Sequence, residues 1–156
     1  MLRHILAAAL LAPALGCDAE SVLAPAPASG APTVAWTDVR IGPTTVQFPC
    51  KAEQLAPGRT RCTLPDGADF SLVVAGVRRS ELDELRQVKA YVQANPGAKL
   101  IQGDAFPVRW TENRWLHKEQ HELHLAGGME CLLTVSYSTA EPPAAAGEFF
   151  SRARMR

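Results

Sequence analysis

Alternation of apolar and polar residues dominates the chain after residue 43, and it constrains the fold most strongly because successive side chains of a strand point to opposite faces. Thr44–Phe48 and Arg59–Leu64 are predicted to pair as a hairpin across a loop that contains Pro57-Gly58. Phe70–Val77 is apolar on both faces apart from Ser71, which is typical of a central strand. Further extended segments are predicted at Lys99–Gln102, Phe106–Trp110, Arg114–Leu125 and Cys131–Ser138.

Two segments interrupt this pattern with helical signals. Ser80 can cap a helix over Glu81–Ala94, whose apolar residues recur at helical spacing and which Asn95-Pro96-Gly97 ends. Pro142–Ala153 is predicted as a short C-terminal helix opened by prolines. The expected fold class is therefore α+β: an antiparallel β-sheet of about six strands, with an amphipathic helix after the third strand and a C-terminal helix packed on the sheet.

The first 33 residues have the features of an export and anchoring segment. Residues 1–16 carry a basic start and an apolar run too short to span a bilayer, so a signal peptide is predicted. Ala14-Leu15-Gly16-Cys17 resembles a lipobox, which predicts acylation of Cys17; ordinary cleavage after Gly16 is the alternative. An Ala/Pro-rich tether would then run from Cys17 to residue 33, and one globular domain from 34 to 156. We expect a protein of the cell envelope, lipid-anchored to a membrane, with its domain periplasmic or extracellular.

Charge and motif content narrow the function further. Removing residues 1–16 takes away one of 16 basic residues, Arg3, and leaves 15 against 16 acidic ones, which argues against nucleic-acid binding. The sequence has no Gly-x-Ser-x-Gly motif, no phosphate-binding glycine loop and no Cys-x-x-Cys. We therefore expect a protein that is not an enzyme and carries no cofactor.

Three segments together resemble the PsbP-like family: Val46-Gln47-Phe48-Pro49, Gly103–Trp110 and the terminal Glu148–Met155. The resemblance covers nearly the whole predicted domain, although Ala153 replaces a phenylalanine of the family's closing pattern. It implies an α/β/α sandwich in which helices cover a sheet. It also implies interaction rather than turnover, because the understood members of the family act by binding other proteins.

Three cysteines remain after Cys17, in a compartment that permits disulfides. Cys50 ends one predicted strand and Cys62 lies in the next, so a Cys50–Cys62 disulfide is predicted, with Cys131 as a buried thiol. The alternative pairs Cys62 with Cys131 and leaves Cys50 free.

Three histidines, His117, His121 and His124, would form a metal site if they lay on one helix face. On a strand, however, His117 and His121 share a face about 13 Å apart while His124 points the other way. A metal site is therefore not expected from these three residues.

Tryptophan and arginine, which are enriched at interface hot spots, cluster around a predicted turn at Thr111-Glu112-Asn113. The candidate binding residues are Arg109, Trp110, Arg114 and Trp115. The leading function is a protein-binding or assembly module with an envelope protein partner. The alternative is a carrier of a small ligand or metal, which a deep apolar pocket with convergent polar groups would favour.

Overall fold

The computed structural model describes residues 34–42, 44–77 and 79–155. The predicted signal peptide, the predicted lipidation site Cys17 and the predicted tether lie outside these residues. Among the described residues, no helix has the length and apolar character needed to cross a membrane.

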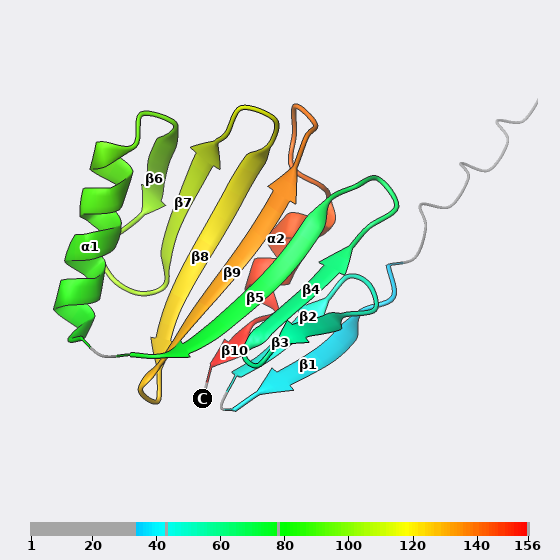
Figure 1. Ribbon diagram of the computed structural model, residues 1–156, viewed down its shortest axis with the longest axis horizontal. Coiled ribbons are helices and arrows are strands. Elements are labelled where there is room, and N and C mark those ends of the chain that lie inside the picture. The colour runs from blue at the N-terminus through cyan, green and yellow to red at the C-terminus, as the bar shows by residue number, and fades with distance from the viewer. Residues whose placement is uncertain (1–33, 43, 78, 156) are drawn as a thin grey trace, which may run out of the picture. The chain divides into compact units, whose positions relative to one another are not determined.

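The domain contains two antiparallel sheets (Figure 1). The smaller sheet has the order β1-β2-β10, with β1 at Thr37–Ile41, β2 at Thr44–Phe48 and β10 at Arg154–Met155. The larger sheet has seven strands in the order β3-β4-β5-β9-β8-β7-β6. Its strands are β3 (Glu53–Ala56), β4 (Arg59–Thr63), β5 (Asp69–Gly76), β6 (Ala98–Gln102), β7 (Val108–Asn113), β8 (Lys118–Ala126) and β9 (Met129–Tyr137).

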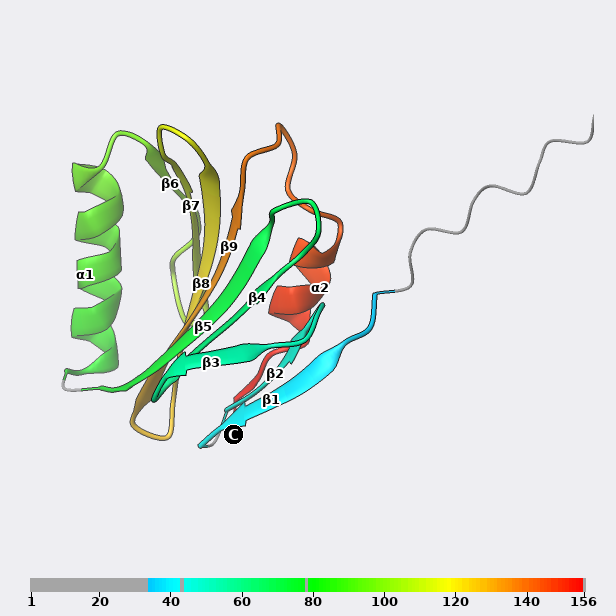
Figure 2. The same cartoon turned by 45° about the vertical axis from the view of Figure 1, so that its right-hand side comes forward.

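Two helices lie on opposite faces of the larger sheet, as Figure 2 shows. Helix α1 spans Glu81–Ala94 with the predicted bounds, and Ser80 caps it by accepting a hydrogen bond from the backbone N–H of Asp83. Helix α2 spans Ala145–Ser151 and is shorter than the predicted Pro142–Ala153, because the chain returns to an extended course as β10. The α+β class is therefore confirmed: mostly antiparallel sheets with two helices.

Each face of the larger sheet carries its own hydrophobic core. The main core joins β2, β4, β5, β9 and α2, and at its centre the ring of Phe149 meets the rings of Phe48 and Phe70 edge-to-face, each at 5.2 Å. The second core lies under α1, where Val88 packs against Val108, Trp110 and Leu123. The second core is the smaller one, and it borders the cavity described below.

The structure corrects several details of the predicted sheet. Residues 34–42, 44–77 and 79–155 form ten strands in two sheets rather than about six in one, and α1 follows the fifth of these strands rather than the third. Three short strands, β1, β3 and β10, were not predicted. The predicted hairpin between Thr44–Phe48 and Arg59–Leu64 is wrong, because β2 pairs with β1 and β10 whereas β4 pairs with β3 and β5. The predicted turn at Thr111–Asn113 is also wrong, because β7 continues through Asn113 and the chain reverses at residues 114–117.

The predicted disulfide is confirmed, although its geometric reason differs. Cys50 and Cys62 are bonded, with their Cα atoms 5.8 Å apart, within the usual range for a disulfide. The bond joins the segment after β2 to β4, and so links the two sheets rather than two strands of one hairpin. Cys131 is free and buried in the main core, where its Sγ lies 2.9 Å from Oγ1 of Thr44.

Candidate functional site

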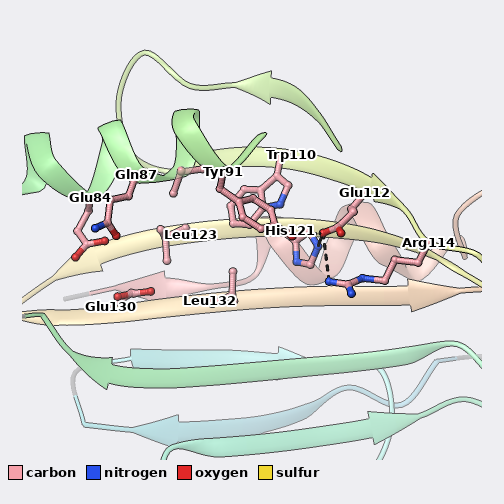
Figure 3. A pocket seen from close by; sticks show the side chains of 11 residues that line it. Glu84, Gln87, Tyr91, Trp110, Glu112, Arg114, His121, Leu123, Glu130 and Leu132 are labelled. Carbon is pink, nitrogen blue, oxygen red and sulfur yellow. Dashed lines mark hydrogen bonds and ion pairs between the residues drawn. The ribbon is translucent and has the colours of Figure 1, made fainter. Parts of the chain in front are cut away.

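A cavity of about 350 Å³ lies between α1 and the face of the sheet formed by β7, β8 and β9 (Figure 3). Its floor is mainly apolar, and polar side chains gather at both ends of it. The lining residues are Glu84, Gln87, Val88, Tyr91, Trp110, Glu112, Arg114, His121, Leu123, Glu130 and Leu132.

Strand register brings the cavity's polar residues together. In the β7–β8 hairpin Trp110 stands opposite His121 and Glu112 stands opposite Glu119, so all four side chains point to the α1 face. The next register places Thr134 of β9 beside His121. One end of the cavity is therefore built from neighbouring rows of one sheet, and α1 adds Tyr91 from above.

A hydrogen-bonded network holds the two carboxylates at this end. Glu112 Oε2 accepts hydrogen bonds from the Tyr91 hydroxyl at 2.8 Å and from Arg114 Nη2 at 3.4 Å. Glu119 Oε2 accepts from Arg114 Nε at 2.9 Å, and its Oε1 lies 3.0 Å from His117 Nε2. Two carboxylates thus share one guanidinium, and Arg114 is itself half-exposed at the rim.

Electrostatics at this end follow from burial and from these bonds. Burial alone would raise the pKa of Glu119, but the hydrogen bonds from His117 and Arg114 hold this pKa below its ordinary value. The hydrogen bond to Glu112 raises the pKa of the Tyr91 hydroxyl. Glu119 therefore stays ionised and Tyr91 stays a neutral donor at neutral pH.

His121 is the most deeply placed titratable group of the network, with a side chain 9% exposed. Its ring stacks on Trp110 with centroids 4.7 Å apart, and its Nδ1 lies 3.0 Å from Thr134 Oγ1. Burial lowers the pKa of His121, although Glu119 and Glu112 act in the opposite direction, so the neutral imidazole prevails at neutral pH. Its Nε2 is buried and has no hydrogen-bond partner among the described residues.

The opposite end of the cavity carries a second acidic pair. Glu84 of α1 is buried and lies 3.7 Å from Arg79, as measured from Oε1 to Nη1. Burial and the charge of Glu84 raise the pKa of Glu130 on β9. Acidic groups therefore stand at both ends of an apolar floor.

The three histidines singled out in the sequence are not brought together. His117 ends the turn before β8 and contacts Glu119, and His121 lies on the α1 face. His124 lies on the opposite face, where it contacts the buried carboxylate of Glu122. The register of β8 thus places one of the three imidazoles in the cavity.

The four candidate binding residues also occupy different surroundings. Trp110 is 7% exposed and belongs to the second core. Arg109 points to the other face and pairs with Glu122. Arg114 belongs to the cavity network, whereas Trp115 is 96% exposed at the tip of the β7–β8 turn. Two of the four, Trp110 and Arg114, therefore line the cavity, whereas Arg109 and Trp115 do not.

Glu112, Glu119 and Tyr91 were not among the residues singled out in the sequence. A correctly placed β7–β8 turn would have revealed the two carboxylates, because a reversal at residues 114–117 sets Glu112 opposite Glu119 and Trp110 opposite His121. The hydrogen bond from Tyr91 to Glu112 depends on how α1 packs on the sheet, and no local sequence pattern predicts it.

Comparisons with known proteins bear on the fold. Neither a protein-family model nor a curated protein matches the chain. The chain is similar to a crystal structure of a protein from Bacteroides thetaiotaomicron at 12% identity and a TM-score of 0.51, covering 75% of this chain and 47% of that one. It thus spans about half the length of that protein.

A second solved structure similar to the chain is the solution structure of cyanobacterial PsbP from Synechocystis, at 10% identity and a TM-score of 0.47. The similarity covers 86% of this chain and 99% of that one. At these identities both likenesses concern the fold alone.

Proposed function

We propose that this domain is a non-enzymatic binding protein of the cell envelope that carries a small, mainly apolar molecule in the cavity between α1 and β7–β9. The observation that carries this proposal is the cavity itself. Its volume of about 350 Å³ falls at the lower end of the range of small-molecule sites, roughly 300–1,000 Å³. The cavity thus favours the carrier function over the protein-binding module that the sequence alone favours.

The lining supports an apolar ligand with a polar end. Leu123 and Leu132 of the sheet and Val88 of α1 come from three different elements and supply the apolar lining. Burial of such surface yields about 25 cal/mol per Å² of apolar area removed from water, which favours a ligand that covers this floor. Tyr91 and Glu112 at the end of the floor would orient the ligand by hydrogen bonding.

Charge narrows the class of ligand. The carboxylates of Glu84, Glu112 and Glu130 line the cavity, and Arg114 is the one arginine or lysine among the described residues that lines it with them. Arg114 already pairs with Glu112 and Glu119. An anionic ligand would meet repulsion at both ends, so a neutral or amine-bearing molecule fits better.

Binding is a better account than turnover because the cavity lacks an activated nucleophile among the described residues. No serine, cysteine or lysine lines it, and Cys131 is buried in the core on the other face of the sheet. Burial also raises the pKa of the Cys131 thiol, which keeps it in the unreactive protonated form.

Anchoring by a lipid on Cys17 would hold this carrier at a membrane surface, and plain signal cleavage would release it. Mass spectrometry of the mature amino terminus decides between the two. An acylated Cys17 is the expected result, and a mature terminus without acyl mass would contradict it.

Titration with the neutral fluorescent probe N-phenyl-1-naphthylamine tests the carrier function. Saturable fluorescence enhancement is expected for the wild-type protein. Leu132→Trp places a large side chain in the cavity and should abolish the enhancement. Ile101→Trp adds the same ring at an exposed position on β6 and should leave it intact. Absence of saturable binding, or equal binding by Leu132→Trp and wild type, would contradict the proposal.

A second candidate function is capture of a protein partner by the β7–β8 turn. Trp115 and Leu116 are 96% and 76% exposed at its tip, an unusual exposure for two adjacent large apolar residues. Crosslinking and affinity purification from native membranes would recover a stoichiometric partner with the wild-type protein but not with Trp115→Ala. Equal recovery with both proteins would rule out this role for the turn.

A further inference from the structure

We propose that Glu112, Glu119 and His121 form a binding site for one divalent transition-metal ion, of the Zn²⁺ class, at the end of the cavity. A carboxylate oxygen from each glutamate and a ring nitrogen of His121 all lie within 4.8 Å of one another. The site goes beyond the apolar-ligand proposal, because metal binding is measured without any organic ligand.

His121 provides the observation that points to a ligand. Its side chain is more than nine-tenths buried, and its Nε2 has no hydrogen-bond partner among the described residues. Glu119 Oε2 lies 3.3 Å from this nitrogen and Glu112 Oε2 lies 3.9 Å from it. When Nδ1 donates its proton to Thr134, the Nε2 lone pair faces two carboxylate oxygens. Tyr91 and Arg114 donate hydrogen bonds to these oxygens, but no described group donates one to Nε2. A cation bound between these atoms would accept the Nε2 lone pair and balance the carboxylate charge.

The spacing fits a tetrahedral ion. Zn–N and Zn–O bonds of about 2.1 Å put two tetrahedral ligand atoms about 3.4 Å apart. The separation of 3.3 Å between His121 Nε2 and Glu119 Oε2 already meets this spacing, and a small rotation of Glu112 would close its 3.9 Å. One imidazole and two carboxylates suit Zn²⁺ and its neighbours better than Mg²⁺ or Ca²⁺, which prefer oxygen ligands alone.

Arg114 is the built-in competitor of the ion. Its guanidinium contacts both carboxylates and neutralises one of their two charges. Its side chain is about half exposed, so it can swing outward when an ion takes its place. Tyr91 and His117 hold Glu112 and Glu119 in position as outer partners, and such partners commonly affect metal affinity.

Isothermal titration of ZnCl₂ into protein freed of metal by EDTA tests the proposal. One ion per chain with micromolar or tighter affinity is expected. Glu119→Gln and Glu112→Gln conserve shape and should each weaken binding at least about tenfold, since even outer partners cost 10- to 100-fold. Arg114→Gln should tighten binding because it removes the competing cation. His124→Ala, on the other face of the same strand, is the control and should bind as wild type does.

His121→Ala should abolish binding, and its thermal unfolding shows whether it folds. An anomalous-diffraction peak next to His121 Nε2 in crystals soaked with ZnCl₂ gives a second readout that needs no variant. No 1:1 binding at micromolar Zn²⁺, unchanged affinity in both glutamine variants, weaker binding by Arg114→Gln, or a peak elsewhere would each overturn the site. Probe binding in EDTA separates its failure from failure of the carrier function.

Discussion

Removal of the Cys50–Cys62 disulfide is expected to lower the free energy of unfolding by about 3 kcal/mol. The two cysteines are 12 residues apart, and closing a loop of that length removes roughly 9–10 cal/mol/K of entropy from the unfolded chain, which is about 3 kcal/mol at 25 °C. The bond also ties the smaller sheet to β4 of the larger one. Its loss therefore loosens the contact between two elements of the main core.

Urea unfolding followed by tryptophan fluorescence measures this effect. With a slope of about 2 kcal/mol per molar urea, the midpoint should fall by about 1.5 M in the Cys50→Ala/Cys62→Ala variant. Dithiothreitol should lower the wild-type midpoint by a similar amount and leave the double variant unchanged, because the remaining described cysteine, Cys131, is unpaired. Equal midpoints for oxidised and reduced wild type would show that the disulfide does not contribute this stability.

Three further perturbations test the packing and the electrostatics. Phe149→Ala removes a fully buried ring with edge-to-face contacts to two others, and urea unfolding should show a loss of about 3–5 kcal/mol; a loss below 1 kcal/mol would contradict its central position. Ser80→Ala removes the cap of α1 and should cost about 1 kcal/mol, while Ser80→Asp should retain most of it. Burial and the charge of Glu84 raise the pKa of Glu130 in the folded protein above its value in the unfolded chain. As pH rises from the unfolded pKa to the folded pKa, the unfolded chain loses this proton more readily, so the free energy of unfolding falls. Glu130→Gln should therefore be more stable than wild type at pH 7, by at most about 0.5 kcal/mol because solvent screens this partly exposed group, and no more stable below about pH 4; an advantage that persists at low pH would rule out this cause.

Local signals predicted the elements of this fold better than their pairing. The bounds of α1 were predictable because Ser80 and Asn95 form hydrogen bonds with backbone groups three and four residues away, so the signal is local in the sequence. The pairing of β2 with β1 and β10 depends on contacts between distant parts of the chain, and β10 is only two residues long. Short strands carry too few alternations to be recognised.

The candidate site was predictable only in part, for a related reason. The residue types of His121 and Arg114 made them candidates from the sequence, but the residues that surround them depend on the register of β7 against β8. A turn placed three residues too early shifts every cross-strand pair, which separates Glu112 from Glu119. Closeness in sequence can also mislead, because Trp110 and Arg109 are adjacent in the chain but lie on opposite faces of the sheet.

¹H–¹⁵N NMR of the protein titrated with N-phenyl-1-naphthylamine shows whether a ligand occupies the cavity. Three indole N–H signals report three places: Trp110 in the cavity, Trp36 beside Arg152, and Trp115 at the exposed turn. The Trp110 signal should shift together with the backbone signals of α1 and β9, while those of Trp36 and Trp115 stay in place. Shifts concentrated at Trp115, or an unmoved Trp110 signal at saturation, would show that the probe does not bind in the cavity.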